Sequence, residues 1–158
     1  MRRMTITSTA LALAVAAVVA GCSGGSASPS TPPSPSGAAT AAVDVTLQEW
    51  AVVPASASVA AGEVSFNAKN AGPKNTHEMV VLKTDLAPDA LPTQADGSID
   101  EEGAGVTLIG EVEDVPVGSS KTVTLDLASG KDVLLCNIVD GSEVHYKLGM
   151  RTAFEVTP

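Results

Sequence analysis

The stretch Leu135-Cys-Asn-Ile-Val-Asp-Gly-Ser-Glu-Val-His-Tyr-Lys-Leu-Gly-Met150 carries three side chains that can bind a soft metal ion. Eight residues separate Cys136 from His145, and four separate His145 from Met150. A short apolar run precedes the cysteine, and an alternating apolar and polar pattern follows the methionine, so both flanks are predicted strands. The three side chains therefore lie in one loop between two strands, where a loop can fold all of them around a single ion.

A fourth candidate ligand, His77, lies far upstream at the head of an apolar run. Alone, a buried cysteine is more often a small core residue, and a lone histidine is usually a surface or hydrogen-bonded residue. Together, one thiolate, two imidazoles and one thioether are the ligand set of a blue-copper electron-transfer site. Sulfur ligands suit Cu(I) and imidazole nitrogen suits Cu(II), so this set can hold both oxidation states with little rearrangement.

The chain from residue 43 onward has the pattern of short β-strands. The alternating segments are 43–49, 64–70, 122–127 and 152–157, and the continuous apolar runs are 79–82 and 133–135. Turn signals between them lie at 61–62, 72–73, 117–118, 129–130 and 140–141. This spacing predicts an all-β fold, a Greek-key β-sandwich or barrel. The acidic segment 85–106 is expected to be a solvated loop rather than a docking surface.

Residues 1–21 are typical of an export signal. Two arginines open the chain, and the apolar stretch 10–20 is too short to cross a bilayer as a stable helix. The stretch ends in Val19-Ala-Gly-Cys22, which resembles the lipobox of bacterial lipoproteins. That resemblance implies a lipid on Cys22 and an extracytoplasmic protein anchored to the cell membrane. The alternative is a plain secretory signal with an incidental cysteine.

Residues 22–42 are predicted to be the lipidated cysteine and a Pro/Ser-rich tether, and residues 43–158 a single domain. If Cys22 carries lipid, Cys136 has no disulfide partner, and a metal is the simplest protection for a thiol in an oxidising compartment. Loss of the two arginines with the signal leaves seven Lys and Arg against 18 Asp and Glu, a net charge of −11. Nucleic-acid binding is not expected on that balance.

Two segments, Asn70-x-Gly-x-x-x-x-His77 and Leu135-Cys-Asn-Ile…His145-Tyr-Lys-Leu-Gly-Met150, resemble those of the cupredoxins, the small blue copper proteins of the plastocyanin and sulfocyanin type. The resemblance implies a Greek-key β-sandwich and outer-sphere, one-electron transfer. It also implies one mononuclear type 1 copper with His77, Cys136 and His145 in its trigonal plane and Met150 as the long axial contact. The spacing from Cys136 to His145 is longer than in most small members and resembles the copper domain of nitrite reductases. The extra residues 140–143 are expected to bulge outward.

The residue inventory limits the function further. No histidine remains for a second, catalytic copper, and one cysteine cannot form a binuclear centre, so we expect no enzyme activity. The favoured hypothesis is a monomeric electron carrier, tethered to the outer face of the membrane, that exchanges electrons with a cytochrome, an oxidase or a reductase. The alternatives are a copper delivery or storage protein and a metal-free adhesive or structural sandwich. We also expect His77 to be buried and His145 to reach the surface.

Overall fold

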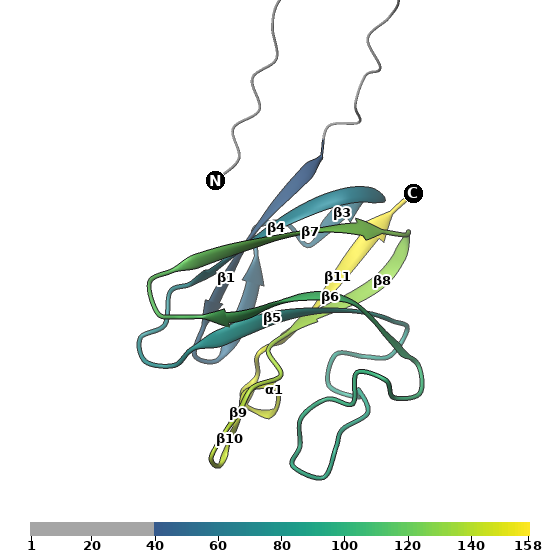
Figure 1. The fold of residues 1–158 in the computed structure, drawn as a ribbon. Coiled ribbons are helices and arrows are strands. Elements are labelled where there is room, and N and C mark those ends of the chain that lie inside the picture. The colour runs from purple at the N-terminus through teal and green to yellow at the C-terminus, as the bar shows by residue number, and fades with distance from the viewer. Residues whose placement is uncertain (1–39) are drawn as a thin grey trace, which may run out of the picture. The chain divides into compact units, whose positions relative to one another are not determined.

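The computed structural model describes residues 40–158, which form eleven strands and one helical turn (Figure 1). The elements are β1 (Ala41–Gln48), β2 (Ala51–Pro54), β3 (Ser58–Ala60), β4 (Gly62–Asn70), β5 (His77–Thr84), β6 (Val106–Val115), β7 (Ser120–Leu127), β8 (Gly130–Leu135), β9 (Val139–Asp140), β10 (Glu143–Val144), α1 (His145–Leu148) and β11 (Arg151–Thr157). The predicted signal, Cys22 and nearly all of the predicted tether lie outside the described residues. Among residues 40–158, no helix has the length and apolar character needed to cross a membrane.

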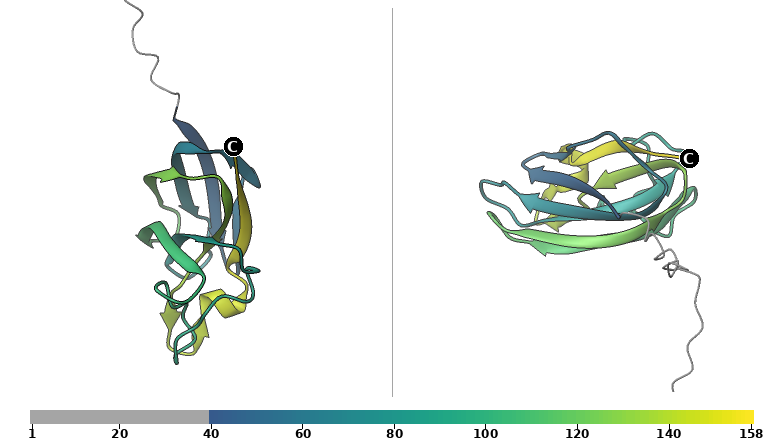
Figure 2. Two further views of the ribbon diagram at one scale, coloured as in Figure 1. Left: turned by 90° about the vertical axis from the view of Figure 1, so that its right-hand side faces the viewer. Right: turned by 90° about the horizontal axis from the view of Figure 1, so that it is seen from above.

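The strands form two facing sheets, which confirms the predicted all-β sandwich (Figure 2). One sheet has the order β2-β1-β4-β7 and the other has the order β3-β11-β8-β5-β6. The chain changes sheet between β2 and β3, β3 and β4, β4 and β5, β6 and β7, and β7 and β8, while β9 and β10 form a separate hairpin. All six predicted strand segments lie within observed strands or differ from them by one residue, whereas β2, β3, β6, β9 and β10 were not predicted.

The main core lies between the two sheets because the strands alternate buried and exposed side chains. In β4, Val64, Phe66 and Ala68 are fully buried, while the residues between them are only partly covered. The Phe66 ring meets the Phe154 ring of β11 edge-to-face, with centroids 5.7 Å apart, which joins the two sheets at the centre of the core.

A second apolar cluster covers the other face of the five-stranded sheet. Val80 and Leu82 of β5 pack there with Val133 and Leu135 of β8. The segment between β5 and β6 supplies Leu91 and Ile99, and α1 supplies Tyr146. Most polar residues of that segment are exposed, as expected for a solvated loop, and these two apolar side chains anchor it to the sheet.

The strand directions bring the sequence motifs to one end of the sandwich. β5 begins there with His77, β8 ends there, and β11 begins there, so the connection 136–150 crosses that end. The described chain begins at the opposite end, where β1 starts and β11 finishes (Figures 1 and 2). The sandwich thus separates the start of the folded chain from the motif-bearing end.

Candidate metal centre

Three predicted ligands come together in a buried cluster at this end. The ligand atoms of His77, Cys136 and His145 all lie within 4.8 Å of one another, and none of the three residues is exposed. The His77 Nδ1 and His145 Nδ1 atoms are 3.2 Å apart, and the Cys136 Sγ is 3.3 Å from His145 Nδ1. One ion can therefore contact two imidazole nitrogens and one sulfur, which are the equatorial ligands of a type 1 copper site.

Asn70 shapes the loop that delivers His77. Its fully buried side-chain amide donates to the Asn75 carbonyl at 2.8 Å and to the Val115 carbonyl at 2.9 Å, and its Oδ1 accepts the Gly72 N–H at 2.7 Å. Gly72 has a φ of +26°, and a Cβ there would lie 2.9 Å from a methyl of Val117. The Asn-x-Gly pattern before His77 is therefore explained by a tight turn that a larger residue would strain.

Backbone hydrogen bonds fold the second ligand loop onto itself. The Cys136 N–H donates to the Met150 carbonyl at 3.0 Å, and the Met150 N–H donates to the His145 carbonyl at 3.1 Å. These bonds hold Met150 next to the cluster residues, and its side chain is fully buried. The intervening β9–β10 hairpin carries exposed residues at its tip, as expected for residues 140–143. The axial role of the Met150 thioether stays a prediction.

Burial sets the protonation state of the cluster. It raises the pKa of the Cys136 thiol to about 12, so the thiol keeps its proton at neutral pH without a metal. It also lowers the pKa of both histidines, and the neighbouring His145 lowers that of His77 further. Neutral imidazoles are the form that binds metal. The cluster can therefore take up an ion at neutral pH if the thiol proton leaves.

Both imidazoles keep a buried nitrogen without a hydrogen-bond partner. These atoms are His77 Nε2 and His145 Nε2. Buried polar groups normally find partners, and exceptions mark strain, a functional role or an unplaced ion or water. The two Nδ1 atoms face each other at the cluster, so each ring directs one nitrogen inward and one outward. The donor set fits a metal bound through Nδ1, with the outward nitrogens carrying the ring protons.

A hydrogen-bond network links Cys136 to the segment between β5 and β6. The Glu78 N–H lies 3.5 Å from Cys136 Sγ, and its carboxylate accepts the Asn137 N–H at 2.7 Å. The Asn137 side chain in turn accepts the Ile99 N–H and donates to the Ile99 carbonyl and the Glu101 carboxylate. Burial is the main cause that raises the pKa of Glu78 to about 7, and the neighbouring carboxylates add to it. The chain around Cys136 is thus hydrogen-bonded to the segment between β5 and β6.

Two residues beside the cluster were missed by sequence reasoning. Glu49 and Trp50 form the turn between β1 and β2. Glu49 Oε1 lies 3.7 Å from His77 Nε2, and the Trp50 ring centroid lies 5.0 Å from that of His145. Glu49 lies 26 residues before Asn75, which it contacts, and no spacing pattern in the sequence predicts that contact. The contact arises from tertiary packing alone.

The expectation that His145 reaches the surface was wrong. Its side chain is completely buried, like that of His77, because the half-buried Trp50 ring packs on it and the connection 136–150 encloses it. His145 lines a pocket of about 520 Å³ together with other residues at this end: Lys74, Asn75, Thr76, Asp114, Ile138, Val139 and Asp140. Access to the cluster from solvent therefore lies near this pocket, without an exposed imidazole edge.

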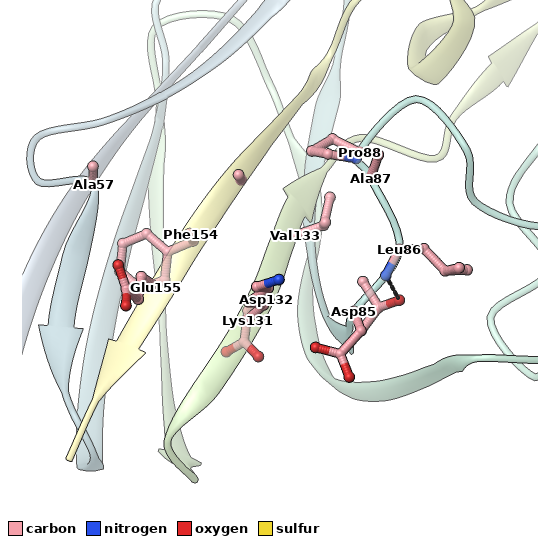
Figure 3. A pocket seen from close by; sticks show the side chains of 12 residues that line it. Ala57, Asp85, Leu86, Ala87, Pro88, Lys131, Asp132, Val133, Phe154 and Glu155 are labelled. Carbon is pink, nitrogen blue, oxygen red and sulfur yellow. Dashed lines mark hydrogen bonds between the residues drawn. The ribbon is translucent and has the colours of Figure 1, made fainter.

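Another pocket, of about 580 Å³, lies between β8, β11 and the chain after β5 (Figure 3). Its charged lining residues are Asp85, Lys131, Asp132 and Glu155, and the rest of its lining is mostly apolar. None of its lining residues is a histidine or a cysteine, so it offers no soft metal ligand and plays no part in the centre described above.

Comparison with known structures identifies the architecture. The chain superposes on the dithionite-reduced auracyanin of the photosynthetic bacterium Roseiflexus castenholzii with a TM-score of 0.55 and 21% identity, covering 77% of this chain and all of that one. Auracyanin B matches with a TM-score of 0.51 and 21% identity, over 74% of this chain and 88% of its own. Auracyanin A of Chloroflexus aurantiacus, described as a "blue" copper protein, matches with a TM-score of 0.50 and 19% identity, over 75% of this chain and 99% of its own.

The chain has the cupredoxin fold. No protein-family model matches the sequence. No curated protein matches it either. At these identities the likeness concerns the fold, and the evidence for metal chemistry comes from the cluster itself. The cupredoxin fold and a cluster of His77, Cys136 and His145 at one end of it occur in the same chain.

Proposed function

We propose that this chain is an electron carrier built on one mononuclear type 1 copper, with His77, Cys136 and His145 as equatorial ligands and Met150 as the axial ligand. The observation that carries the proposal is the approach of one sulfur and two imidazole nitrogens to within 4.8 Å in a fully buried site. Copper, when bound, supplies a Cu(I)/Cu(II) couple that moves one electron at a time.

The protein residues hold the ligand atoms and exclude water. Cys136 gives up its proton when the metal binds, and the two neutral imidazoles bind without losing one. The ligands are held by β-strand ends and by the hydrogen bonds of Asn70, so they keep their places when the charge at the centre changes. Both histidines of the chain belong to this cluster, which leaves none for a second copper and supports a carrier rather than an enzyme.

We propose further that a lipid on Cys22 and the tether after it hold the domain at the outer face of the cell membrane. β1 starts at the end of the sandwich opposite the cluster, so a tether joined there leaves the cluster end free to meet a partner. A cytochrome, an oxidase or a reductase fits as partner, through the small, weak interface typical of redox encounters. Replacing Cys22 by alanine should move the protein from the membrane to the soluble fraction.

The deciding experiment adds Cu(II) to the purified domain and records optical and electron-spin-resonance spectra. We expect an intense colour from sulfur-to-copper charge transfer, and we expect Cys136→Ser to abolish it because a hydroxyl is a hard, poorly ionised ligand. Met79→Leu, in another fully buried methionine of the core, is the control and should keep the colour. A coloured Cys136→Ser protein would refute the ligand assignment. Rapid transfer of copper to acceptors, with slow electron exchange, would favour delivery over electron transfer.

A further inference from the structure

The turn between β1 and β2 places a carboxylate against the outward side of a ligand imidazole. Glu49 Oε1 lies 3.7 Å from His77 Nε2, at a position where the histidine is fully buried and the Glu49 side chain is only 11% exposed. The two groups are thus close in a poorly solvated environment. Electrostatic interactions are much stronger there than at an exposed surface.

Glu49 is held in place by the loop that delivers His77. Its Oε1 accepts the Lys74 N–H at 3.0 Å and the Asn75 N–H at 2.6 Å. Burial by itself raises the pKa of Glu49, but these hydrogen bonds more than offset it and leave the pKa below its usual value. Glu49 is therefore an anion at neutral pH, with its orientation fixed by two backbone donors.

Both residues keep one buried polar atom without a hydrogen-bond partner. His77 Nε2 and the second carboxylate oxygen, Glu49 Oε2, are both buried without a hydrogen-bond partner. The other ring nitrogen, His77 Nδ1, faces the cluster. When Nδ1 binds a metal, the ring proton must reside on Nε2, directly beside the carboxylate. Metal-ligating histidines commonly donate this proton to a carboxylate or a carbonyl, which fixes the ring and raises its basicity.

We propose that Glu49 is a positioning residue of the metal centre, which holds His77 with its proton on Nε2 and its Nδ1 lone pair directed at the ion. Its negative charge then favours Cu(II) over Cu(I) and lowers the reduction potential. This inference rests on the proposed copper function, and it concerns a residue that supplies no ligand atom. A purely structural Glu49, which only ties the loop at Lys74 and Asn75, would leave the potential unchanged.

The substitution Glu49→Gln separates these two roles. A glutamine oxygen can still accept the Lys74 and Asn75 N–H groups, but the charge is lost. We expect Cu(II) affinity to fall roughly tenfold more than Cu(I) affinity, which raises the potential by about 59 mV for a one-electron couple. Separate Cu(I) and Cu(II) competition titrations and direct voltammetry give two independent measurements of the effect.

Glu143→Gln is the matched control. Its carboxylate accepts a hydrogen bond from the Asn75 side chain at 3.2 Å and so borders the same loop. Among the described residues it forms no hydrogen bond or salt bridge with an imidazole, and its charge acts on His145 rather than on His77. We expect it to shift the potential less than Glu49→Gln does. Equal shifts in the two variants, or an unchanged potential in Glu49→Gln, would overturn the proposal.

A measurement on the unsubstituted protein guards against misfolding of the variant. In the diamagnetic Cu(I)-loaded protein, long-range proton–nitrogen NMR should place the His77 ring proton on Nε2, and nuclear Overhauser contacts should join that proton to the Glu49 side chain. An Nε2 proton without contacts to Glu49 would overturn the proposal for Glu49 while leaving the copper function intact. Failure of the unsubstituted protein to bind copper would instead refute the proposed function, so the two failures are distinguishable.

Discussion

The two ends of the sandwich both bury titratable groups but satisfy them in different ways. At the end away from the cluster, Lys83 Nζ lies 3.6 Å from the buried Asp132 carboxylate and donates to the Ala128 and Ser129 carbonyls. At the cluster end, His77 and His145 each keep a buried nitrogen without a partner. Asp132 Oδ1 also lacks a hydrogen-bond partner, but the Lys83 ammonium compensates its charge. At the second end a thiol and two imidazoles converge, which is a donor set that an ion can bind. Buried polar groups without partners require an explanation, and at the cluster end the convergence of one sulfur and two imidazoles favours a bound ion.

The largest expected effect is the pH dependence of copper binding at the cluster end. Because burial raises the pKa of Cys136 to about 12, the thiol is protonated throughout the neutral range and must release one proton when copper binds. Affinity should therefore rise about tenfold per pH unit above the histidine pKa values and below that of the thiol. Copper titrations between pH 7 and pH 9, in buffers of different ionisation heat, would measure the proton count.

The matching control for that measurement is Cys136→Ser, in which no thiol remains to lose a proton. Its weaker metal binding should show no such slope over the same range. A flat affinity in the unsubstituted protein would mean that the thiolate is already formed before the metal arrives. That result would contradict the burial argument for Cys136.

The next effect concerns the other end, where Lys83→Met leaves Asp132 buried without its counter-charge. Breaking a fully buried ion pair by removing one partner costs about 3–5 kcal/mol. The Lys83 side chain is one-third exposed, so we expect a loss near the lower limit, about 3 kcal/mol. Denaturant unfolding of the metal-free protein measures it. The Lys131→Met variant loses the same charge from an exposed neighbour of Asp132 and should cost much less.

The copper spectrum should stay unchanged in Lys83→Met. His77 and Lys83 occupy opposite ends of β5, and six strand residues span roughly 20 Å. A changed spectrum would show that the two ends are coupled through the strand. In that case the two ends of the sandwich could not be treated as independent.

Much of this fold was predictable because alternation of apolar and polar residues reports a strand with one buried face. The strands that escaped prediction lack that signal for physical reasons. β2 and β3 are only four and three residues long, and β9 and β10 have two residues each. β6 is an edge strand whose pairing with β5 contains two register shifts, which interrupt the alternation. Edge position and bulges are properties of the assembled sheet and leave little trace in the local sequence.

The candidate site was likewise only partly predictable from the sequence. The cluster of His77, Cys136 and His145 followed from residue types and spacing, since soft and imidazole ligands have few other reasons to converge. The burial of His145 did not follow, because Trp50 covers it from a turn distant in sequence. Glu49 was missed for the same reason. Local sequence patterns predict the residues that bind an ion, whereas packing between the sheets determines which residues surround those ligands.

A smaller effect at the cluster end involves Glu78, whose pKa burial raises to about 7 from an ordinary 4.5. The carboxyl is neutral in both folded and unfolded protein below pH 4.5, so its full contribution to stability is present there and is lost as the pH rises through 7. Glu78→Gln should remove this loss, on the order of 2 kcal/mol. The variant should therefore gain stability relative to the unsubstituted protein between pH 5 and pH 8, without metal.

The comparison of variant with parent is needed because the two histidines act in the opposite direction. Their lowered pKa values give stability that is present above 6.5 and lost as the pH falls. Both histidines are retained in Glu78→Gln, so their contribution cancels in the difference between the two curves. A difference that stays constant from pH 5 to pH 8 would show that Glu78 ionises normally.

The smallest expected effect on binding comes from Met150, whose backbone is hydrogen-bonded to both Cys136 and His145 and whose side chain is fully buried. A thioether binds copper weakly and stabilises Cu(I), so its loss should change the potential more than the affinity. Met150→Gln offers a harder oxygen donor, which strengthens the axial field on Cu(II) and should lower the potential, while affinity changes less than about tenfold.

Met79→Leu is the matched control, because Met79 is the other fully buried methionine of the same core cluster. Voltammetry on both variants decides the assignment: a potential that moves only in Met79→Leu would transfer the axial role to Met79, and one that moves in neither would indicate a backbone oxygen. A shift confined to Met150→Gln would complete the contrast between the two ends, because a buried methionine would then serve the ion and not the packing alone.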